Sequence, residues 1–448
     1  MAKYLSAPIP TTKMPKGIPY IISNELAERF SFSGMRGILV VFMTTYLMGR
    51  DGQLASMTDE DAKTYYHLFM SGVYLFPILG AIISDVLIGK YYTIISFSLI
   101  YCLGHGTLAV DDTTFGLFVG LTLIAVGSGG IKPCVAANLG DQFGVRNQNL
   151  LTKTYGWFYF AINVGALLGA LLTPILLKYH GPAWAFGVPG VFMLIATTCF
   201  WMGRHRYAHI PPSGMGFIRE AISPEGRRAL GKLSIVFIFQ IVFWALLDQT
   251  GSAWVLQAKR MDLEFMGVEW LPSQVQAANP ILLMVFILLF NYVLYPAAEK
   301  VVRVTPLRKI SLGLFMTVAG FSVPLWIESQ IQAGNTPNIG WQFLAYVLLM
   351  ASEVLVAITF LEFSYTQAPK KLKSVVSAMS YLTVSVANLF VAAVNFFILN
   401  DDGSSKLEGA SYYGFFTGLM LIAAVVFVFV AYFYKEKRYI QDQREPGA

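Results

Sequence analysis

Residues 24–36 read NELAERFSFSGMR and open an apolar run that continues as GILVVFMTTYLMG. Four charged residues, Glu25, Glu28, Arg29 and Arg36, therefore lie at the mouth of a strongly apolar segment. An ionisable group at the centre of a bilayer costs about 2.5–3.5 kcal/mol on insertion scales, so such groups tend to face a polar interior and to have partners. The spacing i, i+3, i+4, i+11 places all four on one face of a helix. We expect that face to line a cavity shared with other helices, because lipid cannot satisfy it.

The composition of the whole chain is that of a membrane protein. Of its 448 residues, 56% are hydrophobic and 13% are charged, whereas a soluble protein of this length has roughly 25% charged residues. Apolar segments of about the 20 residues needed to cross a bilayer recur along the chain. The alternating pattern of a transmembrane barrel does not appear. The composition predicts an all-α membrane protein.

We predict twelve transmembrane helices, at residues 31–49, 67–89, 92–110, 114–138, 155–178, 184–203, 232–257, 276–298, 307–328, 340–364, 374–399 and 411–434. The one long polar connection follows the sixth helix. The predicted divisions are an N-terminal segment with the start of helix 1 (1–30), a six-helix bundle (31–203), a linker (204–231), a second six-helix bundle (232–434) and a tail (435–448). Two six-helix bundles suit the major facilitator fold, in which the substrate site lies at mid-membrane between them. The stretch SDVLIGKYYTI resembles the loop signature of that superfamily through Asp85, Gly89 and Lys90.

The basic residues give the orientation. With both termini inside, 23 Lys and Arg residues outside the membrane helices lie on the cytoplasmic side and six on the other, as the positive-inside rule requires. The basic balance, with a pI near 9.0, is thereby explained without a nucleic-acid partner. The first residues lack the features of a signal peptide, so we expect a cytoplasmic tail there, and we expect a basic surface helix in the linker. The predicted location is the cell membrane.

Five further ionisable residues fall within the predicted helices: His67, Lys132, Asp248, Glu353 and Glu362. For Glu353 a structural ion pair is the favoured interpretation, because nothing beyond its position singles it out. For Lys132 and Glu362, together with the first-helix set, a functional role is favoured.

Four separated motifs resemble the proton-coupled oligopeptide transporter family (POT/PTR). The first is E-x-x-E-R-F, which begins at Glu25, and the second is GGIKPCV around Lys132. The third is FWALLDQTGSAW, with Trp244 and Asp248, and the fourth is LEFSYTQAP, with Glu362. The resemblance implies a symporter that imports di- and tripeptides by alternating access, with protons as coupling ion and no other cofactor. Its partners would be small peptides, protons and membrane lipid, and it would work as a monomer.

The resemblance also implies roles for matching positions. The peptide carboxylate would bind Arg29 and Lys132. The peptide amino terminus would be held by Asn163, Asn279 and Glu362. The rest of the substrate site would comprise Ser33, Arg36, Tyr74 and Trp244. Proton coupling would involve Glu25, Glu28, His67 and Glu362, with Lys132 as an exchanging partner of the two first-helix glutamates. A salt bridge between Arg36 and Asp248 would open and close with the gate.

Structural interpretations of several of these residues stay open. His67 could lie near the outer interface and simply be solvated, Tyr74 and Trp244 could be packing aromatics, and Asn163 and Asn279 could bridge helices. The family's usual tyrosine pair is Phe32-Ser33 here, which widens the pocket. GSGGIK fails the spacing of a phosphate loop, so its glycines are expected to permit close helix contact.

Other functions fit less well. An enzyme would need a nucleophile with a base or a metal cluster; there is no HExxH motif, and the five histidines are scattered. The three cysteines lie in apolar segments without metal-ligand spacing. A channel cannot concentrate its solute and would more often lack opposed charges in two halves. The alternative within transporters is a related proton-coupled carrier of amino acids, peptide-like drugs or other small anions, although the ExxER motif argues against plain nitrate carriage.

Overall fold

The computed structural model describes residues 4–212, 214, 223–367, 373–400 and 405–434, and the structural statements below concern these residues. The predicted tail 435–448 and the centre of the predicted linker lie outside them. Within the described residues, eleven helices are long and apolar enough to cross a membrane. Helix α1 (Ile18–Thr45), which carries the four charges of the opening motif, makes the twelfth. The prediction of an all-α membrane protein is confirmed.

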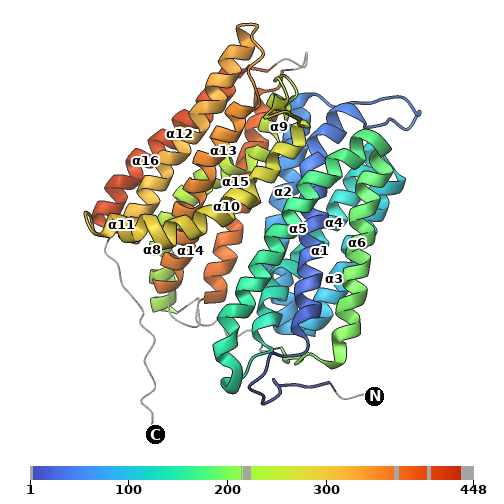
Figure 1. Ribbon diagram of the computed structural model, residues 1–448, viewed down its shortest axis with the longest axis vertical. Helices are drawn as coiled ribbons and strands as arrows, with labels where there is room; N and C mark the ends of the chain where they lie inside the picture. Colours follow the sequence, from blue (N-terminus) through green and yellow to red (C-terminus); the bar gives the residue numbers. More distant parts are fainter. Residues whose placement is uncertain (1–3, 213, 215–222, 368–372, 401–404, 435–448) are drawn as a thin grey trace.

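The first six membrane helices form one bundle, on the right in Figure 1. They are α1, α2 (Asp59–Ile82, continued by a π-helical turn Ile83–Ile88), α3 (Lys90–Val110), α4 (Thr114–Gly140), α5 (Leu151–His180) and α6 (Pro182–Met202). Between α2 and α3, Gly89 has φ +76°, a conformation that side chains with a Cβ rarely adopt, which explains a glycine in this loop signature. Lys90, the next residue, forms an ion pair of 2.6 Å with Asp141 at the end of α4.

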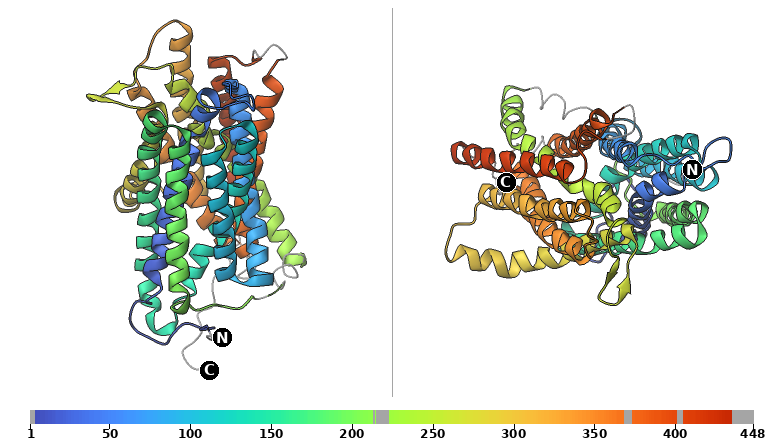
Figure 2. Two further views of the ribbon diagram at one scale, coloured as in Figure 1. Left: turned by 90° about the vertical axis from the view of Figure 1, so that its right-hand side faces the viewer. Right: turned by 90° about the horizontal axis from the view of Figure 1, so that it is seen from above.

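The remaining helices form the second bundle. They are α8 (Pro224–Leu247), which continues through a 3-10 turn Asp248–Gly251 into α9 (Ala253–Ala258), then α10 (Ala278–Leu289) with α11 (Tyr295–Glu299), α12 (Pro306–Gln332), α13 (Gly340–Glu353) with α14 (Thr359–Thr366), α15 (Lys373–Ile398) and α16 (Ala410–Phe433). Strands β1 (Glu264–Phe265) and β2 (Val268–Glu269) pair into a short antiparallel hairpin that projects from the molecule (Figure 2). Seen from above, the two bundles lie side by side (Figure 2).

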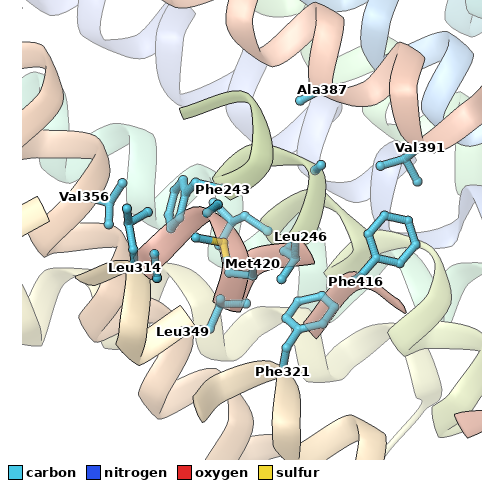
Figure 3. Close-up of a cluster of buried hydrophobic side chains, with 14 of the residues drawn as sticks. Phe243, Leu246, Leu314, Phe321, Leu349, Val356, Ala387, Val391, Phe416 and Met420 are labelled. Carbon is cyan, nitrogen blue, oxygen red and sulfur yellow. The ribbon is translucent and has the colours of Figure 1, made fainter. Parts of the chain in front are cut away.

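Each bundle has its own hydrophobic core. One cluster of buried side chains runs from Ile18 to Tyr207 and includes only Leu256 from the second half of the chain. The other runs from Leu233 to Phe427. Figure 3 shows the second cluster, in which Phe243, Leu314 and Met420 come from three different helices. Packing of these apolar groups against one another holds each set of helices together.

Helix α1 begins earlier than the apolar pattern predicts. The predicted membrane span begins at residue 31, with the start of helix 1 expected within residues 1–30, and the helix starts at Ile18, with a proline in its first turn, where proline is well tolerated. The predicted span begins late because it follows continuous apolarity, which the charged motif interrupts. As a result, the motif lies within the helix, and Glu25 and Glu28 are buried.

The side-chain bonds that join the two bundles gather toward one end of the molecule. We call the end at which α6 ends and α8 begins the linker end, and the other the far end. Near the far end, Lys259 donates to Thr44, Gln276 donates to the carbonyl of Gly37, and Ser71 bonds Ser385. Toward the linker end, a cavity of about 350 Å³ lies between α2, α4 and α15. The side-chain bonds named here between the bundles therefore lie nearer the far end, where a cavity of about 310 Å³ also lies between α2 and the second bundle.

The glycines of GSGGIK lie at a helix contact, as expected. A Cβ on Gly130 would collide with the ring of Phe97 on α3, and one on Gly129 would meet Phe76 on α2. On α2, a Cβ on Gly80 would in turn meet the backbone of Gly129 and Gly130. Close approach of α2, α3 and α4 thus requires small residues, as is common in membrane bundles.

Gly80→Ala should lower the thermal stability of the purified protein in detergent. The added methyl group meets backbone that cannot move aside, and overpacking of this kind costs about 1–3 kcal/mol. Gly106→Ala on α3 is the matched control, since a Cβ there meets nothing within 4 Å. The control should be neutral or stabilising, because alanine in a helix interior is favoured over glycine by about 0.5–1 kcal/mol. Equal unfolding temperatures for the two variants would contradict the close contact.

Candidate functional site

The first-helix motif forms a compact ionic triad. Arg29 Nε lies 2.8 Å from Glu25 Oε1, in a hydrogen bond, and 2.7 Å from Glu28 Oε2. The second contact is an ion pair without hydrogen-bond geometry, since the buried oxygens of Glu28 have no hydrogen-bond donor among the described residues. Glu28 is fully buried. One cation facing two carboxylates leaves an excess negative charge when both are ionised.

Lys132 on α4 is the second cation of this region. Its Nζ lies 4.2 Å from the ring centroid of Phe32 and 4.4 Å from that of Tyr74. This buried ammonium has no hydrogen-bond acceptor within the described part of the chain. Arg29 and Arg36 oppose its charge electrostatically and Glu28 and Asp248 favour it, while the two ring faces provide cation–π attraction. Lys132 is therefore not paired with Glu25 or Glu28 in this structure, where both contact Arg29.

Arg36 and Asp248 join the two bundles. Arg36 Nη2 lies 3.0 Å from Asp248 Oδ1, and Arg36 Nε donates to the hydroxyl of Tyr66 at 2.7 Å. The other oxygen of Asp248 accepts from Asn388 Nδ2 on α15 at 2.7 Å. The pair expected from the sequence is thus present. It lies at the junction of α1, α2, α15 and the 3-10 turn that interrupts the seventh membrane helix.

His67 extends this network. It is fully buried, so the interpretation as a solvated interface residue is wrong. Its Nδ1 lies 2.7 Å from Asn388 Oδ1 and its Nε2 lies 2.8 Å from Ser252 Oγ. Because the amide nitrogen of Asn388 donates to Asp248, the amide oxygen is the acceptor, and Nδ1 of His67 carries the proton. One histidine of the first bundle is therefore held by two residues of the second.

The structure differs from the prediction at Glu353, for which a structural ion pair was expected and none is found among the described residues, and at Glu362, which was expected in the site. Glu362 on α14 is exposed. Glu353, at the end of α13, is partly buried, and its Oε2 is buried without a hydrogen-bond donor among the described residues. It interacts electrostatically with Asp248 and Arg36. The expectation that Glu362 contributes to the site is not supported by this placement, and Glu353 is the carboxylate that faces the interior.

The remaining expected residues have mixed surroundings. Tyr74 covers Lys132. Trp244 is partly buried, and its buried Nε1 has no acceptor among the described residues. The amide nitrogen of Asn163 donates to the carbonyl of Tyr159 one turn earlier, so it already forms a hydrogen bond within α5. Ser33 and Asn279 are partly exposed, on α1 and at the start of α10.

Sequence reasoning missed several members of the network. Asn388 links His67 to Asp248, while Ser252 and Tyr66 complete the set. A signal was present for Asn388, because an amide in an apolar membrane helix needs a partner. None was present for Tyr66, whose aromatic ring is unremarkable in such a helix. Its role is visible only from the bond with Arg36.

Comparison with known proteins gives a consistent result. A family model described as the POT family matches residues 91–223 and 215–402. The chain is 36% identical over 375 residues to "Peptide transporter family 1" of Drosophila melanogaster, covering 73% of this chain and 49% of the relative. It is 35% identical over 407 residues to "Solute carrier family 15 member 2" of Homo sapiens, covering 78% and 55%. The chain thus spans about half the length of these curated relatives.

A solved structure is similar over nearly its full length. The crystal structure of the POT family transporter PepTSo superposes with a TM-score of 0.86 at 36% sequence identity. The match covers 94% of this chain and 98% of that one. The arrangement of helices is therefore that of a POT transporter, and the resemblance inferred from the four motifs is confirmed.

The pair of Arg36 and Asp248 should show strong coupling in a double-mutant cycle. Removing one partner of a buried ion pair costs about 3–5 kcal/mol, and we expect the lower end because the Arg36 side chain is 22% exposed. Arg36→Ala and Asp248→Ala should each lower the unfolding temperature in detergent, and the double variant should lose less than the sum. Glu269→Ala, on exposed strand β2, is the control and should change little. Strictly additive losses would show that the contact does not stabilise this state.

Proposed function

The chain belongs to the POT family, and from that premise we propose that it is a proton-coupled symporter that imports di- and tripeptides across the cell membrane by alternating access. The proposal rests on two ionisable groups of opposite charge whose buried atoms can each accept a bond from, or donate one to, a ligand. Lys132 Nζ in the first bundle and Glu353 Oε2 in the second both lack hydrogen-bond partners among the described residues. A buried charge is costly unless it is paired, so both groups favour a ligand that brings the complementary charge. A zwitterionic peptide carries one such charge at each end.

This arrangement would recognise the terminal carboxylate and amino groups of the peptide rather than its side chains. The carboxylate would meet Lys132 and Arg29, and the amino group would meet Glu353, in place of the Glu362 expected from the sequence. Asn163, Asn279, Ser33, Tyr74 and Trp244 would line the space between. Recognition of termini alone supports broad tolerance of peptide sequence.

Proton coupling would act through the triad of Glu25, Glu28 and Arg29. Burial favours a neutral carboxyl, and a nearby cation favours a charged one. When a peptide carboxylate approaches Arg29, it competes with the two glutamates for the same guanidinium. A glutamate that loses this cation gains a proton more readily, so peptide and proton would bind together. Glu362, which is exposed, would take no part.

The gate would be the network around Arg36, Asp248, Asn388 and His67. These bonds lie in the half of the molecule in which the bundles are tied together. If the linker end faces the cytoplasm, as the positive-inside rule supports, the structure is closed toward the outside. Opening outward would separate Arg36 from Asp248 into water, where an ion pair is worth about 0–1 kcal/mol. The protein would work as a monomer in lipid, with both termini in the cytoplasm.

The names of the relatives support peptide as the substrate, since the Drosophila protein is called a peptide transporter. The second candidate, a proton-coupled carrier of amino acids or other small anions, is favoured by the substitution of Phe32-Ser33 for the tyrosine pair. With Phe32 packed on Lys132, the hydroxyl that a tyrosine would offer there is absent.

Uptake into liposomes tests the proposal. Purified protein should accumulate a labelled dipeptide when the outside is acidic, and a protonophore should abolish the accumulation. Free amino acids and nitrate at the same concentration serve as competing solutes and should displace the dipeptide poorly. Accumulation that persists with the protonophore and without another ion gradient would overturn proton coupling, and stronger competition by amino acids would favour the second candidate.

Glu353→Gln should weaken dipeptide binding at least tenfold, whereas Glu362→Gln should leave it unchanged. In this proposal Glu353, and not Glu362, would meet the ligand amino group, and loss of one buried charge partner is worth about 2–5 kcal/mol in recognition. Binding measured by thermal shift with dipeptide and with its N-acetylated form gives the readout. The acetylated peptide has no amino-terminal charge, so the parent and Glu353→Gln should bind it equally. A loss confined to Glu362→Gln would restore the assignment made from the sequence.

A further inference from the structure

A buried histidine outside the network above lies directly behind the first-helix motif. His105 on α3 is fully buried. Its Nδ1 lies 3.1 Å from the carbonyl oxygen of Phe186 on α6, and its Nε2 lies 3.3 Å from Ser31 Oγ on α1. Ser31 in turn donates to the carbonyl oxygen of Pro189 on α6 at 2.6 Å. One ring therefore connects α3 to both α1 and α6.

The positions of the hydrogen atoms decide which protonation state of the His105 ring fits these three contacts. Phe186 and Pro189 offer carbonyl oxygens, which accept and cannot donate. If only Nδ1 is protonated, the Ser31 proton can go to Nε2 or to Pro189, and one of these contacts is left without a hydrogen. If only Nε2 is protonated, bare Nδ1 faces the Phe186 carbonyl. With both nitrogens protonated, Nδ1 donates to Phe186, Nε2 donates to Ser31, and Ser31 donates to Pro189. The charged imidazolium alone satisfies all three contacts.

The charged groups around the ring come from α1 and its neighbours. Ser31 follows Glu28 by one helical turn, and α6 contains no charged residue. On α3, Tyr101 lies with its ring centroid 5.1 Å from that of His105 and interacts electrostatically with Glu28 and Arg29. The only charged residue of α4, which packs against α3, is Lys132. Burial opposes a charge on the ring, whereas the three hydrogen-bond contacts favour the charged form. The charge of the ring can therefore change when these contacts change.

We propose that His105 is a proton-holding residue of the coupling mechanism, which positions α1 according to its charge. This inference rests on the proposed function. Protonated, the ring ties α1 and α6 to α3 through three complete bonds. Loss of the proton breaks one of them and loosens the turn of α1 that carries Glu28. The proton state of the triad is thereby linked to the packing of the first bundle, at a site that no peptide touches.

The ring can be followed directly by nitrogen-15 NMR of histidine-labelled protein in nanodiscs. The chain has five histidines, and His105→Gln identifies the resonances of this one. We expect the His105 ring to change from the doubly protonated to a neutral form as the pH of the sample is raised from about 4 to about 8. Ser31→Ala removes the oxygen that accepts from Nε2, so the charged ring should persist only at lower pH. His180→Gln, at the exposed end of α5, is the control and should leave the His105 signals unchanged. A ring that stays in one neutral tautomer throughout this range overturns the proposal.

A second measurement separates coupling from structure. In liposomes, His105→Gln should shift the pH dependence of dipeptide uptake, while exchange of dipeptide at equal pH on both sides should fall less than threefold. A purely structural role would lower both in parallel with unchanged pH dependence, which would overturn the proposal. Because the NMR titration needs neither substrate nor gradient, its failure leaves the carrier function standing. Absence of any peptide uptake by the parent, with a titrating ring, would instead overturn the proposed function.

Discussion

The rest of the structure depends on one constraint, which is that a charge that leaves water for the membrane interior must find its partner on another helix. Arg36 shows how this is met. Its guanidinium contacts Tyr66 in its own bundle and Asp248 in the other, and Asp248 is bonded in turn to Asn388. None of these groups can move alone without leaving a buried polar atom unsatisfied. The bonds that join the bundles at this point must therefore break together. A carrier that opens alternately to the two sides of the membrane would need such a contact.

The same constraint explains which parts of the fold could be predicted. Helix number and the division into halves follow from the lengths of the apolar segments and of the polar connections between them, because these lengths reflect the bilayer itself. The start of α1 could not be found in this way. Its first turns carry charges that are satisfied inside the bundle, and a hydropathy pattern does not record where a partner lies. The breaks at Asp248 and the hairpin of β1 and β2 are also products of tertiary packing and leave no periodic signal.

The exchange of roles between Glu353 and Glu362 has a geometric cause. The two residues are nine positions apart, and at 3.6 residues per turn this separation is about two and a half turns. On an uninterrupted α-helix they would point to nearly opposite sides, and the π-helical turn Val354–Ile358 between them changes this angle. They still lie in different environments, since Glu353 is partly buried and Glu362 is exposed. Motif similarity favoured Glu362 because the letters around it match, whereas position on the helix face decides which carboxylate is buried.

Lys132 is stabilised in a way that suits a ligand site. A carboxylate in contact with its ammonium would neutralise it, and a peptide carboxylate would then have to displace a bonded partner. The faces of Phe32 and Tyr74 instead attract the cation, by about 2 kcal/mol where water is excluded, and they do so without forming a hydrogen bond. The ammonium keeps its three donors for a ligand, while the more distant Glu28 and Asp248 reduce the cost of its charge. A carboxylate that bound Lys132 would therefore break no hydrogen bond that the ammonium makes among the described residues. Arg29 differs, since its guanidinium already contacts Glu25 and Glu28. In the proposed mechanism the two cations would thus have different roles, because Lys132 would supply affinity whereas Arg29 would pass the effect of binding to Glu25 and Glu28.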